Sequence, residues 1–262
     1  MQRRELIIQP VDCEAATKKE VRTMAQPMKL CFSQDVMETS PRKLEILGAR
    51  RVLADGRGFR YALAAAGGVP AGKLCMAKVA VPQHVNLDGT SAAVGERVLC
   101  LTLGAAPAAE NDYEDGYLQV TAATGQGHQY RILSNSAAAA SGRMVLTLAE
   151  PLRAALDDTT KVSLTASPWR GVAPSDQEEN LPAGVAPCDV PGGHHFWSQS
   201  SGPALCLSAD ASAPGTMLVP AATTGALAGA GSPAAQDKPV VAVAWATAGV
   251  AGQYRPCCLT MD

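Results

Sequence analysis

The chain has 262 residues, of which 47% are hydrophobic and 18% are charged, and its net charge is −2. This apolar content excludes a chain that is disordered throughout, and the near-zero charge excludes a nucleic-acid binder along the whole length. A chain this long can bury the core of one large all-β unit or of two small domains.

The N-terminal part of the chain is basic. Residues 1–60 hold 12 Lys and Arg against 8 Asp and Glu, and residues 61–262 hold 10 against 16. Such an imbalance indicates either an arm that docks on a negatively charged surface or an ordinary solvated surface. Within residues 1–45, the stretch 12–24 is the best helix candidate, because Asp12 can cap it and a loose apolar stripe follows. The basic residues that we expect to make contacts in this arm are Arg3, Arg4, Lys18, Lys19 and Arg22.

Nearly all of the remaining sequence predicts short strands. The run 161–165 alternates polar and apolar residues with a period of two, as expected for a half-buried strand, and Gly, Pro, Asp and Asn interrupt the runs at short intervals. No series of helices long enough for crossover connections is present, which excludes a parallel α/β fold. We therefore predict an all-β protein of one or two small β-sandwich or barrel modules, with an extended or partly helical N-terminal arm. The predicted strands, in chain order, are 29–33, 50–54, 59–63, 73–79, 97–103, 117–122, 129–133, 143–148, 161–165, 184–189, 195–199, 204–207, 216–219, 239–246 and 254–260.

A polar, acidic run at 174–180 separates two strand-rich regions. We accordingly expect an arm at 1–45, a first β-rich domain at 46–170 and a second β-rich domain at 171–262. Residues 221–236 are rich in Ala, Gly, Thr and Ser, which predicts an exposed loop. The sequence does not determine whether the two β-rich regions pack together as one domain.

The eight cysteines include no Cys-x-x-Cys pair, which is the spacing typical of zinc ribbons and thioredoxin-like sites. Cys75, Cys100 and Cys206 lie within apolar runs, where a thiol behaves as a small hydrophobic side chain. Cys257 and Cys258 are adjacent, and a strand would turn their side chains to opposite faces. We predict buried, reduced thiols.

Motifs for catalysis and cofactor binding are absent from the sequence. There is no Gly-x-Ser-x-Gly nucleophile turn and no glycine-rich phosphate loop, so we expect no cofactor and no enzyme activity. Paired carboxylates of a glycoside hydrolase stay open, because their separation is set only by the fold. The turns at 86–89 and 112–116 offer oxygen ligands for a weak calcium site or, more simply, acidic hairpin turns.

His194 and His195 form the most distinctive polar pair. Adjacent histidines in a strand point to opposite faces and have no further ligand nearby at metal-site spacing, so we expect no metal. Together with Phe196 and Trp197, they instead predict an aromatic-rich strand at a subunit contact. The four residues are His194, His195, Phe196 and Trp197.

Two further partner classes are not expected. Arg60 falls between Phe59 and Tyr61, which is typical of a strand with its aromatic side chains inside and its charge outside, so we expect no nucleic-acid partner. The apolar run at 240–250 is shorter than the roughly 20 residues of a membrane span, and the run at 6–8 is too short for a signal peptide. We expect neither a membrane partner nor secretion.

Several stretches resemble structural proteins of tailed bacteriophages. The sequence GRGFRYA at 56–62 followed by GGVPAGKL at 67–74 is similar to a strand and turn pattern of that group, and LGARRV at 47–52 fits its lead-in. The stretches 168–172, 184–199, 240–245 and 254–256 are similar to the same group. The matching stretches cover roughly half of the chain and are built from turn residues and apolar strands.

The resemblance implies a non-enzymatic virion component, most simply a capsid decoration or cement protein. Such a protein would be made in the host cytoplasm and would sit on the capsid surface. There it would bridge subunits of the major capsid protein, as a homo-oligomer in the simplest case. The alternative is a head or tail fibre or a connector that binds a host surface glycan. An enzyme on a β-scaffold and a non-viral binding module are the remaining alternatives.

Overall fold

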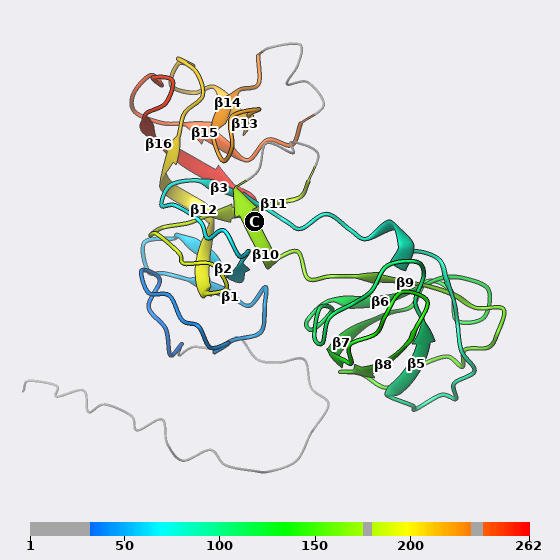
Figure 1. The fold of residues 1–262 in the computed structure, drawn as a ribbon. Coiled ribbons are helices and arrows are strands. Elements are labelled where there is room, and N and C mark those ends of the chain that lie inside the picture. The colour runs from blue at the N-terminus through cyan, green and yellow to red at the C-terminus, as the bar shows by residue number, and fades with distance from the viewer. Residues whose placement is uncertain (1–31, 175–179, 232–237) are drawn as a thin grey trace, which may run out of the picture. The chain divides into compact units, whose positions relative to one another are not determined.

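The structure, a computed structural model, describes residues 32–174, 180–231 and 238–262. Within these residues the chain forms 16 strands and one 3₁₀ turn, η1 (Pro82–His84), which confirms the predicted all-β class (Figure 1). The predicted helix at 12–24 and the basic residues proposed for the arm lie outside the described residues.

Five strands of the larger sheet close into a small barrel. Their order around the barrel is β2 (Gly58–Ala64), β10 (Arg170–Pro174), β3 (Leu74–Met76), β11 (Pro182–Val185) and β12 (His195–Leu207). The barrel closes because β12 also pairs with β2, from His195 opposite Leu63 to Ser201 opposite Gly58. Only β10 and β2 run parallel; the other pairs are antiparallel. The short strand β1 (Arg50–Val52) adds to β2 as a hairpin.

The second half of β12 extends beyond the closed barrel, and there the sheet continues through four more strands. These are, in order across the sheet, β16 (Tyr254–Thr260), β15 (Ala242–Ala244), β13 (Met217–Pro220) and β14 (Leu227–Gly229). A bridge from Ser208 to Leu227 brings β14 back toward the end of β12. Together with side chains of the barrel strands β3 and β11, these strands form a second apolar core, in which Leu218, Leu259 and Cys257 are almost fully buried.

A second sheet has six strands and almost closes on itself. In order they are β4 (Leu87–Asp88), β9 (Lys161–Thr165), β6 (Tyr117–Ala122), β7 (Gln129–Asn135), β8 (Arg143–Leu148) and β5 (Val98–Thr102). The two edge strands β4 and β5 contact each other. Alternate residues such as Leu118, Ile132 and Leu146 point inward to form the core, as the period of two along each strand requires.

The sheets do not follow the expected ranges 46–170 and 171–262. Strands β1 to β3 precede the six-stranded sheet in the chain, yet they belong to the same sheet as β10 to β16. The six-stranded sheet is therefore an insertion between β3 and β10. Sequence composition could not give this result, because pairing across about a hundred intervening residues is a tertiary property.

Many of the individual strands agree with the sequence prediction, and several differ from it. Strands β6, β8, β9 and β16 have the predicted bounds. The segments 195–199 and 204–207 are one strand, β12. Strands β4 and β10 were not predicted, and β10 lies where the boundary between two domains was expected. Strand β14 lies in the range 221–236, where a loop was expected.

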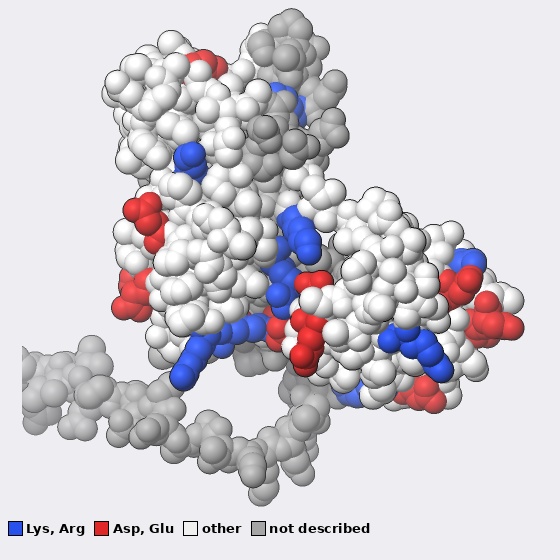
Figure 2. Space-filling model, viewed as in Figure 1, with Lys and Arg blue, Asp and Glu red and all other residues white. Residues whose placement is uncertain are grey.

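Charged side chains are sparse on the face shown in Figure 2, where small groups of blue and red are separated by broad uncharged areas. This agrees with the low charged fraction of the sequence.

Candidate functional site

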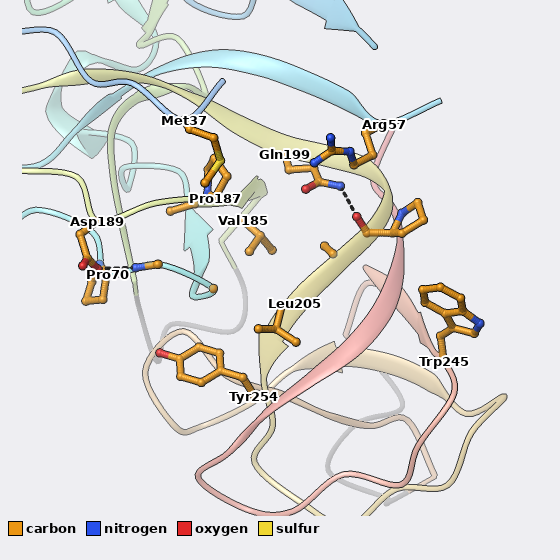
Figure 3. Close-up of a pocket in the computed structure, with 15 residues that line it drawn as sticks. Met37, Arg57, Pro70, Val185, Pro187, Asp189, Gln199, Leu205, Trp245 and Tyr254 are labelled. Atoms are coloured by element: carbon orange, nitrogen blue, oxygen red, sulfur yellow. Dashed lines mark hydrogen bonds between the residues drawn. The ribbon is translucent and has the colours of Figure 1, made fainter. Parts of the chain in front are cut away.

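A groove of about 580 Å³ lies where β12 leaves the closed barrel and pairs with β16 (Figure 3). Its walls are mostly apolar. Four large side chains in its lining are exposed by about half: Met37 (56%), Leu205 (57%), Trp245 (54%) and Tyr254 (46%). Figure 3 shows Tyr254 and Trp245 on either side of Leu205.

Local sequence explains why these side chains face outward. Within β12, Cys206 points into the core, so Leu205, one residue earlier, points to the outer surface. Tyr254 begins β16 opposite Leu207. Trp245 follows β15 directly, and its backbone N–H donates to the carbonyl of Pro256 over 3.2 Å, which ties it to β16.

Three polar side chains of the groove make hydrogen bonds within the chain. The Gln199 amide nitrogen donates to the carbonyls of Ser201 (3.1 Å) and Pro203 (2.8 Å). Asp189 Oδ1 accepts the backbone N–H of Ala71 at 2.8 Å, and Arg57 Nε donates to Asp55 Oδ2 at 2.7 Å. The groove therefore offers a partner mainly apolar area.

The lining does not supply the carboxylate pair that a glycoside hydrolase would use. Among the described residues that line the groove there is one carboxylate, Asp189, and no Ser, Cys or His. Retaining and inverting glycoside hydrolases canonically use two carboxyl groups that flank the bond that breaks. A binding surface is thus the simpler interpretation of this groove.

The aromatic-rich segment predicted as a subunit contact is built into the chain's own barrel. His195 is 8% exposed, and Phe196 and Trp197 are fully buried, while His194 is half-buried. Phe196 points into the barrel core. The expected contact therefore does not present these three side chains at the surface, because β12 is a central strand with both of its faces covered here.

The outer face of this part of β12 is covered by residues near Gln34. Trp197 Nε1 donates to the Gln34 carbonyl (3.2 Å), and the Tyr61 hydroxyl donates to Gln34 Oε1 (3.0 Å). The His195 ring stacks on Tyr61 with 5.7 Å between centroids. Burial lowers the pKa of His195, with Lys43 and Arg170 nearby acting in the same direction.

The two acidic turns form structure rather than an open cation site. Asn86 and Asp115 have φ of 58° and 60°, the left-handed conformation that suits Asn and Asp in turns. Asp112 Oδ2 accepts the backbone N–H of Ala109 (2.9 Å), and Asp115 is paired with Lys43 and Arg131. Within the described part of the chain, no three His, Cys, Asp or Glu side chains gather as a metal site.

The comparisons with known proteins return no relative. Searches against family models, curated proteins and solved structures found no match for this chain. In the described ranges, no helix has the length and apolar content to cross a membrane.

Sequence reasoning did not single out the groove residues Leu205 and Tyr254. Trp245 and Tyr254 do lie in stretches that carry the phage resemblance, but nothing in their neighbourhood marks them as exposed. These side chains come together only because β12 pairs with β16 and β16 with β15.

Proposed function

We propose that this chain is a non-enzymatic decoration or cement protein, which binds a phage capsid by docking its apolar groove on the major capsid protein. The observation that carries the proposal is the cluster of half-exposed Leu205, Trp245 and Tyr254 on a small closed barrel, beside polar groups that are already hydrogen-bonded. The resemblance in the sequence supplies the class of partner.

The physical basis of such docking is burial of apolar surface. Clustered exposed apolar side chains mark interaction sites more often than isolated ones do, and aromatic side chains are enriched where proteins meet. Each groove would contribute a modest free energy of binding. Repetition by capsid symmetry, with subunits bridged, would make the sum large.

Two substitutions test the role of the groove. Leu205→Glu places a charge in the middle of the groove, and Leu133→Glu is the matched control, because Leu133 is also an exposed strand leucine (43%) but lies in the six-stranded sheet. We expect the Leu205 variant to lose binding to particles at least tenfold and the Leu133 variant to bind as the wild-type protein does. Equal binding of both variants to particles would show that the groove is not the surface that docks on the capsid.

The class of protein is tested by copy number. Quantitative mass spectrometry of gradient-purified particles should find this chain in a ratio to the major capsid protein near one or a simple fraction of one. Absence from particles would refute the proposal, whatever the groove variants do.

The same groove also favours one alternative, a fibre or connector protein that binds a host glycan. Trp245 and Tyr254 are exposed aromatic rings on its rim, and sugar rings bind on such faces. A copy number of a few per cent of the capsid protein, with glycan binding abolished by Trp245→Ala, would favour this alternative. The Gln199 amide nitrogen, by contrast, is hydrogen-bonded within the chain and is not available to a sugar hydroxyl.

A further inference from the structure

Two cysteines that are 51 residues apart in sequence meet directly under the groove. Cys206 in β12 and Cys257 in β16 have their Sγ atoms 2.8 Å apart, and the residues are 1% and 0% exposed. Their strands are antiparallel neighbours, with Ala204 opposite Cys257 and Cys206 opposite Arg255. The two cysteines are therefore diagonal neighbours whose side chains converge in the same core.

We propose that Cys206 and Cys257 are a reversible thiol pair that closes to a disulfide under oxidising conditions and cross-links β12 to β16. An S–S bond is about 2.0 Å long, so the two sulfurs need to approach by roughly 0.8 Å, which small side-chain and strand adjustments supply. The structure has both cysteines as free thiols.

The oxidant is a small-molecule disulfide. The thiolate of one cysteine attacks it, forms a mixed disulfide and releases one small thiol. The thiolate of the second cysteine then attacks the protein sulfur of the mixed disulfide and releases the other small thiol. The two protein thiols lose two protons and two electrons in total, and the small disulfide gains both.

The environment makes closure slow but lasting. The hydrogen bond with Cys257 and burial raise the pKa of the Cys206 thiol, and the thiolate is the reactive form. Reaction therefore requires transient opening of the β12–β16 pair. Once formed, the bond is protected from reductants by the same burial.

The other described cysteines lack this arrangement. Cys258 is next to Cys257 but lies on the opposite face of β16, half-buried. Cys75 is buried in the closed barrel, and its thiol donates to the Lys73 carbonyl; burial raises its pKa to about 12. This contrast makes Cys258 a suitable control for the pair.

The cross-link would act on the wall of the groove. Leu205 precedes Cys206 in β12, and Tyr254 is three residues before Cys257 in β16. A bond between the two strands fixes the separation of these side chains. The disulfide chemistry does not depend on the proposed function. Only the biological circumstance, a particle released from a reducing cell into an oxidising medium, rests on the proposed function.

The experiment uses the purified full chain, equilibrated with mixtures of reduced and oxidised glutathione, alkylated and digested for mass spectrometry. We expect a peptide that links Cys206 to Cys257, and a thermal midpoint about 5–15 °C higher in the oxidised than in the reduced protein. Cys206→Ala and Cys257→Ala should each abolish this difference, and Cys258→Ala should keep it.

Three results would overturn the proposal: no cross-link, a cross-link between other cysteines, or a Cys206–Cys257 cross-link that leaves the thermal midpoint unchanged. Because each variant is compared with itself in the two redox states, a loss of stability from the substitution does not obscure the result. The outcome does not depend on finding the chain on particles.

Discussion

Replacing Asp115 with Asn should weaken the fold by removing a buried charge from an ionic cluster. The Asp115 side chain is 3% exposed and has Lys43 Nζ at 2.5 Å and Arg131 Nη1 at 3.3 Å. Its Oδ2 also accepts the backbone N–H of Leu47 at 3.0 Å. Asn has nearly the same shape and tolerates the φ of 60° found here, so the substitution changes mainly the charge.

The expected cost lies between two limits. An exposed ion pair contributes about 0–1 kcal/mol, and removing one partner of a fully buried pair costs about 3–5 kcal/mol. Here the carboxylate is buried, but the side chains of Lys43 and Arg131 are each 26% exposed, and Lys43 keeps Glu114 at 2.6 Å. We therefore expect a loss of about 2 kcal/mol, or roughly a 30-fold change in the unfolding equilibrium.

Urea denaturation measures this loss, and thermal unfolding should show a midpoint about 4–8 °C lower. Asp55→Asn is the matched control, because Asp55 also pairs with an arginine, Arg57 at 2.7 Å, but its side chain is 53% exposed. That variant should unfold with the wild-type midpoint. If both variants unfold alike, the buried cluster does not stabilise the fold and the reasoning is wrong.

Two further predictions concern a close backbone approach and a buried histidine. Gly192→Ala should lower the thermal unfolding midpoint markedly, because a Cβ there would lie 1.9 Å from the Ala66 carbonyl oxygen. In the control Gly67→Ala the Cβ meets no atom within 4 Å, so the midpoint should not change. Equal midpoints for the two variants would show that the backbone near Ala66 and Gly192 can move apart at little cost. Burial lowers the pKa of His195 in the folded protein. As the pH falls, the unfolded chain, in which this histidine has a pKa near 6.5, therefore binds the proton first. The stability of the fold should accordingly decrease as the pH drops below about 6.5 toward the lower folded pKa. His195→Gln should reduce the difference in thermal midpoint between pH 7.5 and pH 5, while exposed His128→Gln should keep it; an unchanged difference in the first variant would contradict the assignment.

The sequence by itself determined the class of fold and most of the strands. Local alternation is sufficient to define strands such as β8 and β9, because a half-buried strand imposes a period of two on its own residues. Gly and Pro mark the turns between strands for an equally local reason, since their backbone preferences belong to single residues. The apolar runs around Cys75 and Cys206 also predict their buried state correctly. Cys100, predicted on the same basis, is only partly buried, because exposure also depends on what covers the strand.

Only the tertiary structure decided how the strands associate and which side chains remain exposed. The pairing of β12 with β2 joins residues that are 132 to 143 positions apart, and its pairing with β16 joins residues that are 47 to 59 positions apart. No local pattern encodes such partners. The same pairing buries Phe196 and Trp197 and exposes Leu205 on one continuous strand. Exposure depends on what covers each face of a sheet, and that is settled by packing between distant segments rather than by the residues of the strand itself.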